Sequence, residues 1–167
     1  MRVSIFWVKY DELGRIGIMP RPRAGDWLED EVCSLRDSRV GLIVSLLERQ
    51  LITELELEPE QSICQAQGVQ YISFPILDRD LPLSRQDSER LIGKLVELVS
   101  EGKSIVIHCR QGVGRSAMIA ACLLTELGMS VEDAFEQIRQ ARGWVVPDTE
   151  DQRAWVADFA SGKLRTV

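Results

Sequence analysis

The 167-residue sequence contains one histidine, His108, and four cysteines without any Cys-x-x-Cys spacing. Zinc fingers and histidine-rich metal sites need more such ligands in close spacing, so both are excluded and we expect no metal and no cofactor. Long apolar runs are also missing. Residues 4–8 are apolar but Lys9, Asp11 and Glu12 follow directly, which is too short a run for a signal-peptide core or a membrane-spanning helix. We expect a protein of the reducing cytoplasm that does not enter a membrane.

An excess of positive charge is likewise absent. The 20 Lys and Arg residues face 26 Asp and Glu residues, which gives a net charge of −6 and no general affinity for nucleic acid or anionic lipid. The chain is 45% hydrophobic and 28% charged, which is the composition of a globular protein. It shows no repeat, low-complexity tract or linker. We therefore predict one domain over residues 1–167, present as a monomer.

Apolar β-branched runs alternate with segments of helical periodicity. The predicted strands cover residues 3–8, 16–19, 41–47, 69–76 and 105–107, and we expect the first two to be edge strands. Helices are predicted after Asp26, over 62–67, from Ser84 to Gly102, over 117–127, after Ser130, and from Thr149 to Gly162. This alternation predicts an α/β fold with three layers, in which helices flank a mostly parallel central sheet.

Two segments carry more specific predictions. Asp26 and Glu29 have the spacing of a capping box, and the helix that they open would turn Trp27 toward the core. Residues 48–60 are rich in glutamate, which indicates a solvated helix and turn.

The most informative stretch joins the predicted strand at 105–107 to the helix at 117–127. Residues 108–116 read His-Cys-Arg-Gln-Gly-Val-Gly-Arg-Ser. A glycine-rich turn at the start of a helix points successive backbone N–H groups into one concavity, and the helix dipole adds to the attraction for an anion. Arg115 presents a planar fork of donors that matches two phosphate oxygens. The same positive field favours the thiolate of Cys109, so the loop predicts a phosphate cradle with a sulfur nucleophile at its base.

The pattern His108-Cys109-x-x-Gly112-x-x-Arg115-Ser116 resembles the signature of the cysteine-based protein phosphatases, of the compact dual-specificity type. Further segments at 74–78, 120–124, 139–143 and 149–159 are similar to the cyclin-dependent-kinase-associated members of this family. The resemblance implies hydrolysis of phosphotyrosine in a phosphorylated protein or peptide, through a cysteinyl-phosphate intermediate. Phosphoserine and phosphothreonine are further candidate substrates.

The resemblance also implies roles for the loop residues. Cys109 would be the nucleophile, Ser116 would hydrogen-bond its sulfur and help it leave, and His108 would support the thiolate. The phosphoryl oxygens would be held by the loop, which consists of Arg110, Gln111, Gly112, Val113, Gly114 and Arg115.

A general acid is needed because an alkoxide or phenoxide leaves poorly without a proton. Asp78 and Asp80 lie in one loop after a predicted strand. The resembled family carries its acid in a Pro-x-x-Asp loop, and the spacing from Pro75 makes Asp78 the first candidate and Asp80 the second. Gln152 is a candidate for orienting the hydrolytic water, or else a solvated helix residue.

Alternative functions stay open. A phosphoinositide phosphatase would keep the chemistry, but such relatives carry extra lysines in the loop, where only Arg110 is basic among the variable positions. An RNA triphosphatase is a weaker candidate, because the sequence shows no run of basic residues of the kind that binds nucleic acid. A non-catalytic phosphoprotein-binding module would usually lack the cysteine or the acid. Oxidation of Cys109 to a disulfide with Cys33, Cys64 or Cys122 is a further hypothesis.

Overall fold

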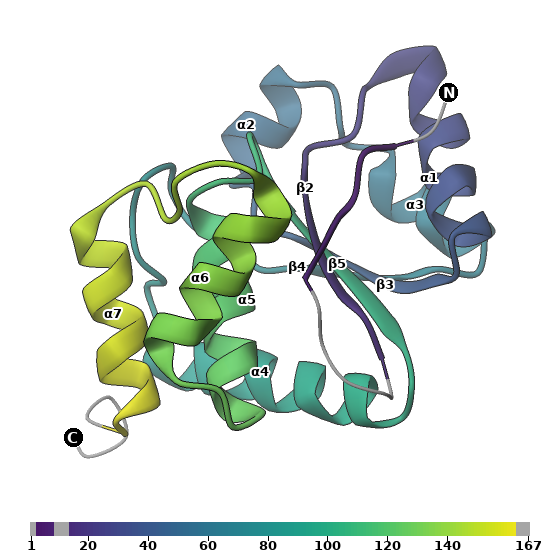
Figure 1. The fold of residues 1–167 in the computed structure, drawn as a ribbon. Coiled ribbons are helices and arrows are strands. Elements are labelled where there is room, and N and C mark those ends of the chain that lie inside the picture. The colour runs from purple at the N-terminus through teal and green to yellow at the C-terminus, as the bar shows by residue number, and fades with distance from the viewer. Residues whose placement is uncertain (1–2, 9–13, 163–167) are drawn as a thin grey trace.

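The computed structural model describes residues 3–8 and 14–162. A central sheet is covered by helices on both faces (Figure 1). The strands are β1 (Phe6–Val8), β2 (Ile16–Pro20), β3 (Val40–Ser45), β4 (Gln70–Ser73) and β5 (Ser104–Cys109). The helices are the 3₁₀ turn η1 (Gly25–Trp27), α1 (Leu28–Asp37), α2 (Arg49–Glu54), α3 (Glu60–Ala66), α4 (Arg85–Ser100), α5 (Arg115–Glu126), α6 (Val131–Arg142) and α7 (Glu150–Ala160).

The sheet has the strand order β1-β2-β5-β3-β4. Strands β2, β5, β3 and β4 pair in parallel, and only β1 is antiparallel to its neighbour β2. The predicted three-layer α/β fold with a mostly parallel sheet is therefore confirmed. The prediction that residues 16–19 form an edge strand is wrong, because β2 lies between β1 and β5. Its buried Ile16 and Ile18 show the continuous apolar character of a strand that helices and neighbours cover.

The core has two halves, one on each face of the sheet. Alternate residues of β5 divide between them: Ile105 and Ile107 pack under α4, α5, α6 and α7, whereas Val106 packs under α1 and α3. All six residues of β5 are buried. Strand β5 is thus held from both faces, and its carboxyl end, where Cys109 lies, is a rigid support for a site.

Three of the predicted helix starts are capped as expected. Ser84, Ser130 and Thr149 each accept a hydrogen bond from the backbone N–H three residues further on. The prediction for Asp26 is wrong: residues 25–27 form a 3₁₀ turn, and α1 begins at Leu28 without a side-chain cap. Trp27 is 52% exposed, and its ring lies under the guanidinium of Arg23, not in the core.

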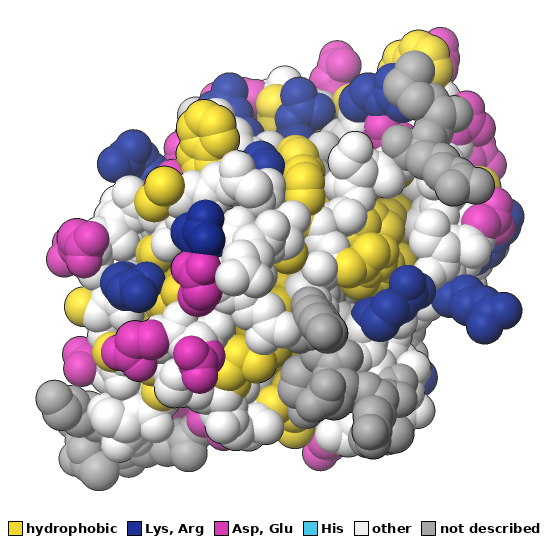
Figure 2. All heavy atoms as spheres, in the orientation of Figure 1, with side chains coloured by type: hydrophobic (Ala, Val, Ile, Leu, Met, Phe, Trp, Pro, Cys, Tyr) yellow, Lys and Arg dark blue, Asp and Glu magenta, His cyan; other side chains and the backbone are white. Residues whose placement is uncertain are grey.

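The acidic segment at 48–60 also differs from its prediction. Leu51 and Leu57 are buried, and so is the carboxylate of Glu60, so only part of the segment is solvated. Basic and acidic side chains are interspersed over the face of the molecule in Figure 2. Within the ranges that the structure describes, no helix has both the length and the apolar character to cross a membrane.

Candidate active site

The predicted phosphate loop connects β5 to α5 at the carboxyl edge of the sheet, where open α/β sheets place their ligands. Gly112 has a φ of +71°, which side chains with a Cβ atom rarely adopt. A Cβ atom there would lie 2.7 Å from the backbone carbon of Met19. The loop therefore packs against the end of β2, and glycine is the residue that permits its path.

The sulfur of Cys109 lies at the base of this loop and is almost fully buried. The backbone N–H of Gly112 donates to Cys109 Sγ at 3.3 Å, and Ser116 Oγ lies 3.3 Å from the same atom. Two donors can therefore stabilise a negative sulfur, which is the state that a nucleophile requires.

Arg115 is the first residue of α5, and its side chain is only 2% exposed. Its Nη1 donates to the carbonyl of Ile76 at 2.9 Å and to Glu48 Oε2 at 3.0 Å. Its Nη2 lies 3.3 Å from Asp78 Oδ1. These contacts hold the guanidinium in one orientation and tie it to the loop that follows β4.

Asp78, Cys109 and Arg115 line the same pocket, which has a volume of about 160 Å³. The other lining residues are Arg79, Arg110, Gln111, Gly114 and Asp148. Of the two candidate acids only Asp78 is in this set. Asp80 is exposed, and its carboxylate accepts a hydrogen bond from the N–H of Leu81.

Gln152 does not line this pocket, and it is fully buried, so the alternative of a solvated helix residue is wrong. Its Oε1 accepts hydrogen bonds from the N–H groups of Asp148 and Thr149, at 3.1 and 3.3 Å. Its Nε2 donates to the carbonyl of Asp80 at 3.2 Å. The side chain thus joins the loop of the candidate acid to the start of α7.

Comparison with known proteins identifies the family. The profile of the dual specificity phosphatase catalytic domain matches residues 43–159, which is most of the chain. The chain belongs to the dual specificity phosphatase family. The resemblance inferred from the loop sequence is therefore confirmed.

Two curated relatives illustrate the range of this phosphatase family. Phosphatidylglycerophosphate phosphatase PTPMT2 of Arabidopsis thaliana is 26% identical over 156 residues, which are 93% of this chain and 63% of that protein. Cyclin-dependent kinase inhibitor 3 of Homo sapiens is 32% identical over 87 residues, which are 51% of this chain and 41% of that protein. The chain thus spans less than two thirds of the length of these relatives.

Solved phosphatase structures share the fold. A kinase associated phosphatase with its catalytic-site cysteine replaced by serine superposes with a TM-score of 0.88, at 21% identity, over 100% of this chain and 98% of that chain. The structure of PTPMT1 gives a TM-score of 0.72 at 18% identity, over 95% and 96% of the two chains.

Three contacts around the phosphatase loop are absent from the sequence prediction. Arg142 of α6 donates from Nε to the carbonyl of Gly112 at 3.0 Å and from Nη2 to that of Gln111 at 3.2 Å. Pairing these carbonyls on the outside of the loop leaves the N–H groups free to face the pocket.

The second contact is made by Asp148. A Cβ atom on Gly114 would lie 2.2 Å from Asp148 Oδ2, so this carboxylate packs directly against the loop.

The third contact is a buried pair behind the nucleophile. Glu60 Oε1 lies 2.7 Å from His108 Nε2, and both side chains are at most 1% exposed. The remaining polar atoms of the pair, His108 Nδ1 and Glu60 Oε2, have no hydrogen-bond partner among the described residues. A buried carboxylate is costly unless it is paired, so each residue requires the other. The sequence offers no signal for Glu60, because it follows three other glutamates at 54, 56 and 58.

The remaining cysteines are free thiols in this structure. Burial, together with the nearby carboxylate of Glu60, raises the pKa of the Cys64 thiol to about 12. Burial also raises the pKa of the Cys122 thiol well above its ordinary value. Because the thiolate is the reactive form, Cys64 and Cys122 are poor partners for oxidation of Cys109.

Proposed function

We propose that this phosphatase hydrolyses phosphotyrosine in protein or peptide substrates, with phosphoserine and phosphothreonine as further substrates. The observation that carries the proposal is the meeting of Cys109, Arg115 and Asp78 in one pocket, under a loop whose Gly112 N–H points at the sulfur. These are the three functions that transfer of a phosphoryl group to sulfur requires: a nucleophile, a clamp for the oxygens and a proton donor.

The chemistry has two displacements. In the first, Cys109 Sγ attacks phosphorus while Arg115 and the loop N–H groups bind the equatorial oxygens, and the P–O bond to the leaving group breaks. Asp78 gives its proton to the departing oxygen. In the second, water attacks the cysteinyl-phosphate with Asp78 as base, and the Cys109 thiolate leaves, assisted by the Ser116 hydroxyl. His108 supports the sulfur from behind.

Replacement of the nucleophile is the first test. Cys109→Ser should abolish hydrolysis of para-nitrophenyl phosphate and of a phosphotyrosine peptide, while tungstate still binds, because the loop and Arg115 remain. Turnover and tungstate affinity are measured on the same preparation. Persisting turnover would contradict the cysteinyl-phosphate mechanism. Tungstate binding by an inactive wild-type protein would identify a phosphoprotein-binding module.

A phospholipid substrate is the second candidate, favoured by one observation. A relative that aligns over 93% of this chain is named a phosphatidylglycerophosphate phosphatase. The pocket is lined by three arginines and two aspartates, so its positive charge is small, which favours a substrate with one phosphate over a headgroup with several. Comparing kcat/KM for phosphotyrosine peptides, phosphoserine peptides, phosphatidylglycerophosphate and phosphoinositides decides between the two substrate classes.

A further inference from the structure

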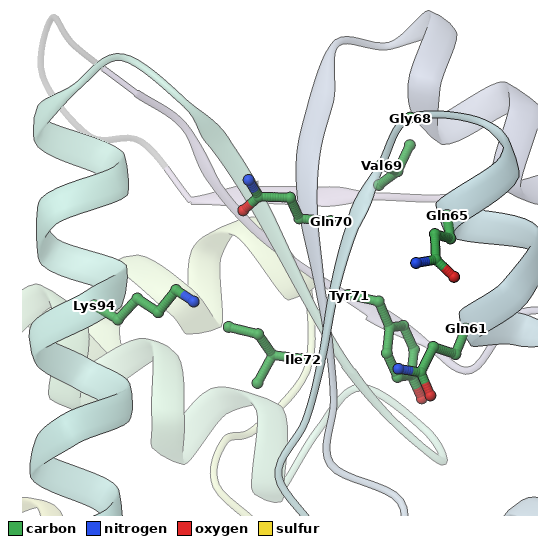
Figure 3. A pocket seen from close by; sticks show the side chains of 8 residues that line it. All are labelled: Gln61, Gln65, Gly68, Val69, Gln70, Tyr71, Ile72 and Lys94. Carbon is green, nitrogen blue, oxygen red and sulfur yellow. The ribbon is translucent and has the colours of Figure 1, made fainter.

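Strand β4 forms one edge of the sheet, and within the described part of the chain it pairs with β3 alone. Helices α3 and α4 lie on opposite faces of the sheet and flank this edge. Figure 3 shows the alternation of the strand: Tyr71 is directed toward Gln61 on α3, whereas Gln70 and Ile72 point toward Lys94 on α4.

Two hollows run along β4, with volumes of about 470 and 590 Å³. Both are lined by Ile72 and Lys94, so they form one continuous depression. We refer to this depression as the β4 groove. It begins beside Gly68, just before β4, follows the strand, and ends beside Leu83 in the loop before α4. It is larger than the phosphate pocket and lies outside it, because the two share no lining residue.

The backbone of β4 presents hydrogen-bonding groups to this groove. Phe74 donates to the carbonyl of Ser45 at 2.9 Å, which directs its N–H toward β3. Because successive residues of a strand turn to opposite sides, the backbone groups of Tyr71 and Ser73 face away from β3. An unpaired strand edge of this kind is a template for one further strand.

The side chains of the groove specify the chemistry of such a strand. No ion pair joins Lys94 to a carboxylate among the described residues, and Arg90 lies 3.5 Å from Asp87. Within the described ranges, Asp87 is the one acidic residue that lines the groove, beside the two basic residues Arg90 and Lys94. Leu83 is 89% exposed at one end of the groove, beside Leu91. The α4 side therefore complements acidic and apolar side chains, which would alternate with residues that face Gln61 and Gln65 on α3.

The groove leads to the proposed active site. Strand β4 continues through Pro75 to Asp78, which lines the phosphate pocket. The five residue-to-residue steps from Ser73 to Asp78 span at most about 17 Å. A segment bound along β4 can thus place a phosphoresidue a few positions away in the pocket.

We propose that the β4 groove binds an extended segment of the phosphoprotein substrate as an added strand. The segment carries acidic and apolar residues at every second position, where they face α4, and polar residues between them, where they face α3. This inference rests on the proposed function, which it deepens by naming a docking surface remote from the phosphate.

The test compares phosphotyrosine peptides with and without a flank. The flank has about six residues, with glutamate or leucine at every second position and glutamine between them, and is placed on either side of the phosphotyrosine. At least one flanked peptide should show a kcat/KM at least about tenfold above that of the short peptide, since several hydrogen bonds and an ion pair are added. N-methylation of alternate flank amides should remove this gain, because it removes the donors of the added strand. Equal kcat/KM for short and flanked peptides would overturn the proposal.

Lys94→Glu tests the charge of the groove, with Lys103→Glu, which directly precedes β5 and lines neither hollow, as the matched control. Only the first variant should lose the gain from the flank, and both should hydrolyse para-nitrophenyl phosphate normally. A gain that survives N-methylation and Lys94→Glu refutes strand addition. Dimers of the peptide-free protein in sedimentation that the flanked peptide does not dissociate would show that β4 instead pairs with a second copy, which also refutes it. Absence of aryl phosphate hydrolysis in the wild type would refute the proposed function itself, separately from the groove.

Discussion

At the scale of single residues, the site depends on groups that never touch the substrate. Arg142 pairs the carbonyls on the outer side of the phosphate loop, and its guanidinium also lies 4.3 Å from the centre of the Phe6 ring. Glu60 holds the imidazole that precedes the nucleophile. Both act by fixing the direction of other groups, which is how a site gains electrostatic preorganisation.

Glu60 provides a prediction at this scale. Glu60→Leu leaves His108 Nε2 without a partner in the core and should lower the free energy of unfolding by about 1–3 kcal/mol. Glu60→Gln retains a polar partner and should recover part of this loss. If Glu60 positions the cysteine through His108, kcat falls in Glu60→Leu while KM for the peptide changes little, and Glu60→Gln restores kcat in part.

Urea denaturation and steady-state kinetics measure these effects. Exposed Glu58 lies in the same segment and supplies the control, Glu58→Leu, which should change stability by no more than about 0.5 kcal/mol. Equal losses in the two leucine variants would show that the buried pair has no special role.

At the scale of elements, contacts with α5 and α7 hold the loop from β4 to α4. The carbonyl of Ile76 accepts from Arg115, the carboxylate of Asp78 contacts the same guanidinium, and the carbonyl of Asp80 accepts from Gln152. Arg79 adopts a left-handed φ of +60°, which turns the chain between the two aspartates. The two carboxylates therefore face different surroundings although they are two residues apart.

This difference predicts unequal effects of two substitutions. Asp78→Asn should lower kcat by about 10²–10⁴ for substrates with poor leaving groups, because the leaving oxygen loses its proton donor. Asp80→Asn should leave kcat close to that of the wild type. The measurement is kcat for a series of aryl phosphates. Asp78→Asn should make the rate depend more steeply on the pKa of the leaving phenol. The reverse pattern in the two variants would assign the acid to Asp80.

At the scale of the whole molecule, one sheet serves both halves of the core. Ile43 of β3 and Val106 of β5 pack on one face, and Val44 and Ile107 of the same strands pack on the other. If one half of the core unfolded, the strands that it shares with the other half would lose the packing on one of their faces. The chain should therefore behave as the single domain that its composition predicts.

Equilibrium unfolding checks this prediction. Tryptophan fluorescence and far-ultraviolet circular dichroism should give one coincident transition in urea. The tryptophans are suitable reporters because Trp7 lies in β1 and Trp155 in α7, far apart in the sequence. Two separated transitions would show that the chain contains independent units.

Much of the site could be predicted because its main parts are local in the sequence. Cys109 and Arg115 lie six positions apart, and the strand, turn and helix that carry them have strong local signals. The helix caps at Ser84, Ser130 and Thr149 are equally local. Trp27 misled the prediction because an apolar ring at helical spacing indicates burial, whereas stacking under Arg23 lets it remain at the surface.

The sequence alone therefore determined the parallel α/β fold and predicted a phosphate loop with Cys109 as its nucleophile, because these depend on neighbouring residues and on periodicity. Only the tertiary structure decided the support of the loop. Glu60 contacts His108, which lies 48 positions further along the chain. Arg142 contacts the loop carbonyls, which lie about 30 positions before it. The packing of α3 and α6 on the sheet determines these partners. The sequence alone does not distinguish a charged side chain that faces water from one that faces a buried group.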